Sequence, residues 1–303
     1  MALAFLDRRP TAAATLGALS IAFSAILFRL ADVSPSTGAF YRCALAVPPL
    51  LAAGAVEERV LGPRSRRDRL LGVIAGLFFV ADLVLWHHAI ESVGAGLGTV
   101  LGNTQVVLVA LVAWLLLGER PGRQTLAAIP VVFGGVVLIS GVVGHGAYGS
   151  NPELGVVYGV LTGVAYTGFL LTLRQGSGTE RAAGPLSDAT LVCAIAVVPV
   201  GYAVGDLDWW PGWTAMAWLL VLALTSQVVG WLLIAFSLPR LPAAVSSVLL
   251  TSQPVASVFF SVLLLGESPS AVQLVGAATI LAGLVLVSSA RRRIAEAPVA
   301  EAG

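Results

Sequence analysis

The chain alternates between long apolar runs and short breaks that are polar or rich in Gly and Pro. The apolar runs are about 17 to 24 residues long, and no break exceeds about a dozen residues. An α-helix of about 20 apolar residues is long enough to cross a lipid bilayer. The pattern therefore predicts ten membrane spans, over residues 12–30, 37–55, 70–90, 94–117, 124–142, 154–173, 187–205, 213–236, 241–265 and 271–289.

One stretch of this pattern occurs twice. Residues 93–140 align without a gap on residues 241–288, 148 positions later, and about a third of the aligned positions are identical. Each copy is an apolar run, a Gly-Glu-x-Pro turn and a second apolar run, as expected for two antiparallel membrane helices. Residues 43–49 also resemble residues 193–199. The duplication therefore covers five predicted spans in each copy.

Arginines mark one side of the predicted membrane region. With ten spans, that side carries every arginine that lies outside a span, and the other side carries only Arg29, at the end of the first span. By the positive-inside rule, we expect both termini in the cytoplasm. The same side carries Arg120 and Arg123 beside the first Gly-Glu turn, whereas the second turn has no arginine. The two copies of the turn therefore face opposite sides of the membrane.

An odd number of spans in each copy inverts the second copy relative to the first. The sequence thus predicts an all-α integral membrane protein of ten transmembrane helices, arranged as two inverted five-helix repeats. Residues 1–148 are expected to form the first repeat, residues 149–290 the second, and residues 291–303 a cytoplasmic tail.

Composition supports a membrane protein and argues against other classes. Hydrophobic residues make up 57% of the chain, charged residues 11%, and the mean hydropathy is +0.92. No soluble domain is left to hold a catalytic site, and no phosphate-binding, zinc-protease or serine-hydrolase motif occurs. We expect no enzymatic activity, cofactor, metal or nucleic acid. The expected partners are a small-molecule substrate, the bilayer and a coupling proton, in a monomer or homodimer.

The first apolar run and the two cysteines each have a simple interpretation. The first apolar run follows Arg8 and Arg9, but no small-residue cleavage site comes after it, so we interpret it as a helix and not as a signal peptide. Cys43 and Cys193 both lie inside apolar runs. We expect them to be buried thiols without a disulfide.

Asp82 is the most informative single residue. It lies about twelve positions into the third predicted span, near mid-membrane, where a carboxylate is costly. It could bind a substrate amine, carry a coupling proton, or bond to a hydroxyl or amide on a neighbouring helix.

Trp86, one turn later on the same face, could line a ligand site or pack in the bundle. His87 and His88 point away from this face, which favours bonds between helices over a proton relay or a metal site.

Amides recur at matching depth in the two copies. Gln105 and Gln253 occupy the same position of the repeat, near mid-membrane, and Asn103 lies close to the first. They could form a central site at the interface of the repeats, or join neighbouring helices. Further polar or aromatic groups at mid-depth are Tyr166, Gln227 and Trp231.

Other charges lie in or beside the predicted spans. Arg42 lies about two turns inside the second span, where it could bind a substrate carboxylate or pair with Asp32 or another acid. Glu119 and Glu267 lie in the two Gly-Glu turns, and we expect them to cap neighbouring backbone. The arginines between residues 64 and 69 are interpreted as a topology signal beside lipid headgroups.

Three motifs stand out together. They are Arg42 after Phe40-Tyr41, the Leu-Leu-Leu-Gly-Glu-Arg-Pro turn at 115–121 with Gly-Gly-Val-Val-Leu at 134–138, and the echo of that hairpin in the second half. The set resembles the EamA-type domains of the drug/metabolite transporter superfamily, over about residues 12–290. The resemblance implies a ten-helix inverted-repeat carrier, often an exporter of amino acids or other small metabolites, with a central cavity lined largely by helices 1, 3, 4, 6, 8 and 9. The chain departs from the pattern at Val192, opposite Arg42, and at Val106, opposite Pro254.

These features predict a secondary transporter of the plasma membrane. It would move a small polar metabolite, such as an amino acid, by alternating access, with export favoured. Alternatives are efflux of hydrophobic cations or drugs, a membrane enzyme acting on lipid or quinone through His87 and His88, and a scaffold that transports nothing. The residues expected to bind substrate are Arg42, Asp82, Trp86, Asn103, Gln105, Tyr166, Gln227, Trp231 and Gln253.

Overall fold

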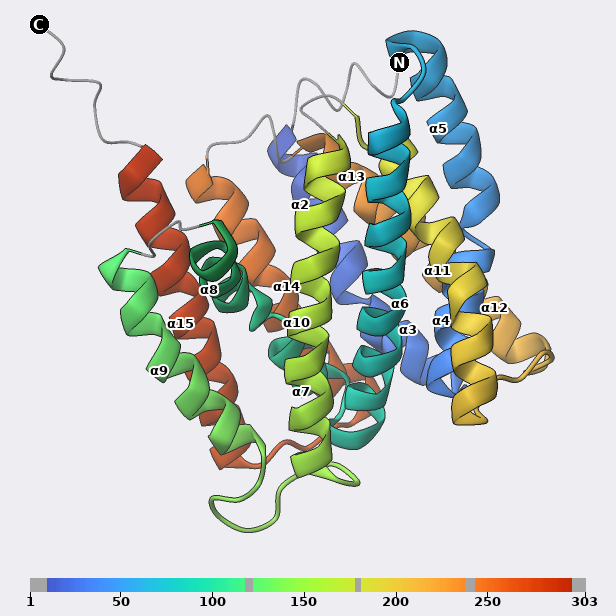
Figure 1. Ribbon diagram of the computed structural model, residues 1–303. Helices are drawn as coiled ribbons and strands as arrows, with labels where there is room; N and C mark the ends of the chain where they lie inside the picture. Colours follow the sequence, from blue (N-terminus) through green and yellow to red (C-terminus); the bar gives the residue numbers. More distant parts are fainter. Residues whose placement is uncertain (1–9, 118–121, 178–180, 238–242, 296–303) are drawn as a thin grey trace, which may run out of the picture.

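A computed structural model describes residues 10–117, 122–177, 181–237 and 243–295 as a bundle of helices (Figure 1). No β-strand occurs within these ranges. The helices of the first half are α2 (Pro10–Ala22), α3 (Ser24–Ala31), α4 (Pro35–Ala44), α5 (Val47–Leu61), α6 (Arg66–Val93), α7 (Ala95–Gly102), α8 (Gln105–Leu117) and α9 (Arg123–Ile139). Those of the second half are α10 (Pro152–Ser177), α11 (Ala183–Val204), α12 (Trp213–Leu222), the π-helix η1 (Ala223–Gly230), α13 (Trp231–Ser237), α14 (Ala243–Leu265) and α15 (Ala271–Ala295).

Several helical segments are long and apolar enough to cross a membrane, which makes the chain a multi-pass membrane protein. The predicted spans 94–117, 124–142, 241–265 and 271–289 also lie on helices. Crossing of the membrane by all ten segments stays a prediction. The six segments that meet the length and hydropathy needed are Pro10–Ala31, Pro35–Leu61, Arg66–Val93, Pro152–Ser177, Ala183–Val204 and Trp213–Ser237.

Local sequence explains where several helices begin and break. Ser65 caps α6, because its hydroxyl accepts a hydrogen bond from the Asp68 backbone N–H while the Asp68 carboxylate accepts one from the Ser65 N–H. The helix pair α4 and α5 breaks just before Pro48 and Pro49, whose missing N–H groups suit the first turn of a helix. The proline pair therefore marks a break inside one long apolar segment.

The helices pack so that segments far apart in sequence lie side by side. Helix α6 lies against α10 and α11, and α11 also contacts α4 and α5. Helices α9 and α15 pair at the opposite side of the bundle (left in Figure 1). Their backbones approach closely at two glycines, since a Cβ added to Gly135 would lie 2.7 Å from the carbonyl oxygen of Gly276.

The two ends of the bundle differ in charge. One end, which we call the arginine-rich end (top in Figure 1), carries the connection between α5 and α6 and the first turn of α6, with Arg64, Arg66, Arg67 and Arg69. The other, the arginine-poor end, carries the turn between α6 and α7 and the connections at 140–151 and 205–212. Arg29, near the end of α3, lies there.

Two carboxylates join α11 to the α4–α5 segment, one at each end. At the arginine-rich end, Glu57 accepts hydrogen bonds from the backbone N–H groups of Ala182, Ala183 and Gly184, at 2.8, 2.8 and 2.9 Å. At the arginine-poor end, Asp206 accepts one from the Ser36 N–H at 3.1 Å. Glu57, near the end of α5, meets the start of α11, and Asp206, just after α11, meets the start of α4. Helix N–H groups are unpaired at both starts. The Glu57 contact and the Asp206 contact are therefore equivalent: exchanging the first and second halves of the chain converts one into the other.

Arg64 is more than a topology signal. Its guanidinium makes two hydrogen bonds to the Asp188 carboxylate, at 2.6 and 3.0 Å, and a third to Glu58 at 2.9 Å. Its side chain is only 5% exposed, whereas that of Arg69 is 54% exposed. A bidentate pair of this kind fixes geometry as well as charge. Arg64 thus ties the α5–α6 connection to α11, which corrects its interpretation as a charge facing lipid headgroups.

Replacing Glu57 by alanine should destabilise the fold. The variant leaves three backbone N–H groups without their acceptor, and the loss of a strong helix cap costs about 2 kcal/mol. The thermal unfolding midpoint of Glu57→Ala in detergent should therefore fall by several degrees. Glu153→Ala, at an exposed position in the first turn of α10, is the matched control and should shift the midpoint much less. Equal shifts in both variants would contradict the capping role.

Candidate functional site

A cavity of about 70 Å³ lies inside the bundle, at mid-length of its helices. Side chains from both halves of the chain line it, including Ile21, Ser24, Thr99 and Thr162. The structure brings most of the predicted site residues together here. The predicted residues that line the cavity are Arg42, Asp82, Trp86, Asn103, Tyr166, Trp231 and Gln253.

The cavity lies where helices are interrupted. Helix α2 gives way to α3 at Phe23, α7 to α8 at Asn103 and Thr104, and the π-helix η1 to α13 at Trp231. Such interruptions free backbone groups and are tolerated at membrane depth where protein buries them or a cavity faces them. Discontinuous helices around a central site are typical of secondary transporters. π-helices also occur frequently at functional sites.

Arg42 supplies the positive charge of the cavity. It comes from α4 and is 3% exposed. Its Nε donates a hydrogen bond to Gln227 Oε1 at 2.9 Å, and Gln227 in turn donates to Thr190 at 3.2 Å. The guanidinium carbon lies 5.5 Å from the centre of the Trp86 ring, within the range of a cation–π contact. Gln227 therefore orients Arg42 from behind and does not itself line the cavity.

Asp82 supplies the negative charge. It lies in the middle of α6 and is 7% exposed. Among the described residues, its carboxylate has no hydrogen-bond partner and no ion pair within 4.0 Å, not even with Arg42. Arg42 and Asp82 thus line one cavity without forming an ion pair with each other. A buried charge in this position is costly, which is expected at a site that receives a ligand.

Three polar atoms around the cavity are buried without a hydrogen-bond partner among the described residues. They are Nη1 of Arg42, Nε1 of Trp231 and Oγ1 of Thr162. A buried donor left without an acceptor costs about 1–3 kcal/mol. The first two can only donate, so the site lacks acceptors near them. Both donors therefore lack an acceptor among the described residues.

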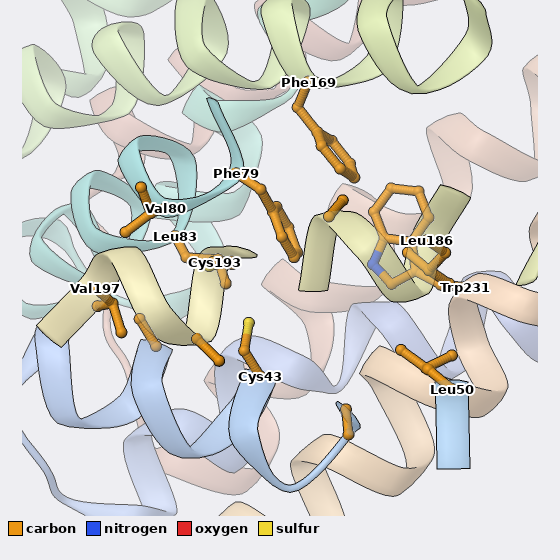
Figure 2. Close-up of a cluster of buried hydrophobic side chains, with 14 of the residues drawn as sticks. Cys43, Leu50, Phe79, Val80, Leu83, Phe169, Leu186, Cys193, Val197 and Trp231 are labelled. Carbon is orange, nitrogen blue, oxygen red and sulfur yellow. The ribbon is translucent and has the colours of Figure 1, made fainter. Parts of the chain in front are cut away.

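Aromatic rings form one wall of the site. Tyr166 and Trp231 lie edge to face, with ring centres 6.3 Å apart. Figure 2 shows Phe79 and Phe169 face to face with Trp231 beside them, and the ring centres of the two phenylalanines are 4.4 Å apart. This packing restricts the rotation of Trp231. The wall therefore presents its indole N–H at a fixed place.

The predicted amide pair is arranged differently from the prediction. Gln253, just before Pro254 in α14, lines the cavity and is 9% exposed. Gln105 is half-buried at the start of α8 and does not line it. Asn103, two residues earlier, takes that place and donates a hydrogen bond to the Thr99 carbonyl at 2.8 Å. The amide from the first copy is thus Asn103.

Some lining residues were missed by sequence reasoning, although a signal existed. Thr162 lies four positions before Tyr166, and Thr99 four before Asn103. Residues spaced by four share a helical face. Checking the residue one helical turn before Tyr166 and before Asn103 would therefore have found both threonines.

The side chains of the adjacent residues His87 and His88 contact different groups. His87 is fully buried, its Nδ1 lies 3.0 Å from the Pro35 carbonyl oxygen, and its ring stacks on Phe28. His88 stacks on Tyr158 instead, and lies 3.8 Å from Glu91. Within the described part of the chain, no group of three His, Cys, Asp or Glu side chains could hold a metal ion. His87 thus joins α6 to α4, as its orientation predicted.

The two cysteines meet in the core beside the site. Cys43 and Cys193 are both buried free thiols. Both belong to the same hydrophobic cluster as Phe79 and Phe169 (Figure 2). The prediction of buried thiols without a disulfide is confirmed.

Comparison with known proteins identifies relatives over most of the chain. The sequence profile of the EamA-like transporter family matches residues 10–141 and 153–289. The "Probable terminal-alkyne amino-acid exporter" of Streptantibioticus cattleyicolor is 26% identical over 254 residues, 82% of each chain. The "Threonine/homoserine exporter RhtA" of Salmonella typhimurium is 24% identical over 220 residues, 72% of this chain and 70% of that protein. The "Uncharacterized transporter YwfM" of Bacillus subtilis is 22% identical over 213 residues, 69% of this chain and 70% of that protein.

The fold also has a counterpart among solved structures. One protein crystal structure superposes with a TM-score of 0.64 at 17% sequence identity. The match covers 97% of this chain and 99% of that one. At this identity, the likeness concerns the fold alone. It extends over the whole bundle and not over one half of it.

Proposed function

The chain belongs to the EamA-like transporter family, and on that premise we propose that it exports a small zwitterionic metabolite, of the amino-acid class, across the plasma membrane. The family is one of transporters, so the chain is not an enzyme. One observation carries the proposed substrate class. Arg42 and Asp82 present opposite charges to the same cavity without pairing with each other.

An α-amino acid carries the two groups that this cavity lacks. Its carboxylate can accept hydrogen bonds from Arg42 Nη1 and Trp231 Nε1, which have no acceptor among the described residues. Its ammonium group can bind the Asp82 carboxylate. Charge-assisted hydrogen bonds of this kind are worth about 1.5–3 kcal/mol each in a dry site. Each end of the ligand therefore compensates a charge that is otherwise buried alone.

Charge argues against the alternative of hydrophobic cations. A cation would meet the positive charge of Arg42, which lines the cavity. Relatives whose names state amino-acid export support the same choice of substrate and direction.

The transport mechanism that we propose is alternating access between two inverted repeats of five spans each. The repeats correspond to residues 1–148 and 149–290, and residues 291–303 form a tail. The reciprocal contacts of Glu57 and Asp206 support the inversion, because a two-fold axis in the membrane plane would relate them. The arginine-rich end would face the cytoplasm. Asp82 would be the group that carries a coupling proton when no substrate ammonium is bound.

Competition in proteoliposomes tests the zwitterion directly. Purified protein is reconstituted with labelled L-threonine inside the vesicles, and its countertransport is measured against L-threonine, its methyl ester and its N-acetyl derivative. The two derivatives each lack one charge and should compete at least about 10-fold more weakly, because each loses about 1.4 kcal/mol or more of binding free energy. Tetraphenylphosphonium should neither compete nor be transported. Transport of that cation without transport of any amino acid would support the alternative.

A further inference from the structure

A second hollow, of about 670 Å³, opens at the arginine-poor end of the bundle. We call it the vestibule. Its lining includes Arg29 from α3, Ile90 and Glu91 from α6, and Gly94, Tyr148 and Ser268 from three connections. This volume is within the range of small-molecule sites. The vestibule can therefore hold a small metabolite together with water.

The loop that forms one wall of the vestibule is held in place on two sides. Gln273, fully buried in α15, accepts a hydrogen bond from the Tyr148 N–H at 2.7 Å and donates one to the Tyr148 carbonyl at 3.0 Å. Ser150 donates to the Glu91 carbonyl at 3.1 Å. Gly149 has a φ of +115°, and a Cβ there would lie 2.4 Å from the Ser92 carbonyl oxygen. The wall is thus built by specific contacts, and its closest approach requires glycine.

The vestibule repeats the charge pattern of the central cavity. Arg29 and Glu91 carry opposite charges, both are exposed, and no ion pair joins them among the described residues. Arg29 also lies at the end of the first predicted span, on the side where the positive-inside rule disfavours arginine. Its position therefore points to a role other than topology.

A buried apolar cluster, which we call the closed layer, connects the lining of the vestibule to that of the central cavity. It contains Phe28, Ile90 and Ala95, of which Ile90 also lines the vestibule, and Trp86 of the central cavity packs against it. Beside it, the Glu267 carboxylate is 2% exposed and accepts hydrogen bonds from the backbone N–H groups of Ala95 and Gly96, at 2.6 and 3.2 Å. This contact holds the α14–α15 turn on the start of α7. A bound substrate would have to pass this layer.

The two charge pairs are too far apart to be one site. Asp82 and Glu91 lie nine residues apart on α6, which is about 13 Å at 1.5 Å per residue. A small amino acid spans much less than this distance. The vestibule and the cavity would therefore hold separate ligand molecules.

We propose that the vestibule is a second binding station, which holds the same zwitterion on the arginine-poor side of the closed layer. Glu91 would bind the ammonium group and Arg29 the carboxylate. This inference rests on the proposed function, because it takes the zwitterion as the substrate. Its consequence is that substrate on the arginine-poor side binds apart from the central cavity and inhibits export from there.

The experiment measures export of labelled L-threonine from oriented proteoliposomes with unlabelled L-threonine added on the arginine-poor side. Two concentrations of L-threonine are compared: the one that half-inhibits export from the arginine-poor side, and the one that half-saturates export from inside the vesicle. The ratio of the first to the second should rise about 10-fold in Arg29→Gln and in Glu91→Gln. Arg59→Gln and Glu153→Gln, both at exposed positions, are the matched controls. A ratio equal to that of the wild type in both vestibule variants would overturn the second station, as would wild-type export that added L-threonine does not inhibit.

The experiments give different results if the proposed second binding station is wrong and if the proposed function is wrong. If Asp82→Asn exports L-threonine at the wild-type rate, the proposed central site is wrong. If Asp82→Asn loses export while the vestibule variants keep the wild-type ratio, only the second station is wrong. Calorimetric titration of purified protein with L-threonine adds a direct readout. Asp82→Asn should retain one binding event, and adding Arg29→Gln should raise the dissociation constant of that event about 10-fold.

Discussion

Asp82→Asn should reduce transport of L-threonine in proteoliposomes by about 10- to 100-fold, while the protein still folds. The amide removes the negative charge that would bind the substrate ammonium group, and a charge-assisted bond in a dry cavity is worth about 1.5–3 kcal/mol. The amide also cannot carry a coupling proton. Because Asp82 has no hydrogen-bond partner or ion pair among the described residues, its replacement breaks no structural contact there.

Stability separates this effect from misfolding. The thermal unfolding midpoint of Asp82→Asn in detergent should not fall below that of the wild type, because the variant removes a buried and unpaired charge. Asp208→Asn, at an exposed position of the 205–212 connection, is the matched control and should transport normally. Asp82→Glu keeps the charge and should recover part of the activity. Wild-type flux in Asp82→Asn would remove Asp82 from the mechanism.

Arg42→Gln should cost both transport and stability. Transport should fall by about 10- to 100-fold, because the substrate carboxylate loses a charged donor. Stability should fall by about 1–3 kcal/mol, because the buried Gln227 Oε1 loses the donor that satisfies it. Unfolding measurements should therefore distinguish Arg42→Gln, which loses stability, from Asp82→Asn, which does not. Arg42→Lys keeps the charge but not the planar donor set, so it should restore only part of the transport.

A second change keeps the prediction for Arg42 testable if the single variant unfolds. Gln227→Leu combined with Arg42→Gln removes the orphaned acceptor, and should bring the unfolding midpoint back toward the wild type. Transport should stay lost in this double variant. If transport returned along with stability, Arg42 would be a structural residue and not a substrate ligand.

The nine predicted site residues show how far a pattern can locate a cavity. Asp82 and Trp86 lie on one face of an unbroken helix, so their spacing alone placed both side chains correctly toward the cavity. Gln105 does not line the cavity, because it lies two residues after Asn103, and two residues of a helix turn a side chain by about 200°, toward the opposite side. The repeat alignment matched Gln105 to Gln253 in depth, but it carried no information about which side of the helix faces the cavity.

Gln227 illustrates a different limit. Its depth in the eighth predicted span placed it near mid-membrane, and it lies there in the π-helix η1. Its role depends on Arg42, which lies 185 positions earlier in the chain. A partner at that separation is chosen by how two helices pack, and no local pattern in the sequence records it. Arg64 is a similar case, because its ion pair with Asp188 joins residues 124 positions apart.

By itself, the sequence determined the class of this protein, namely an α-helical membrane protein of the EamA type, with a duplicated hairpin and with charges inside its apolar runs. Those features follow from hydropathy, periodicity and repetition, which are local or linear properties of a chain. The tertiary structure alone decided that Arg42 and Asp82 share one cavity unpaired, and that Arg29 and Glu91 share another. The reason is physical: which charges meet depends on the packing of helices that the chain brings together from distant positions.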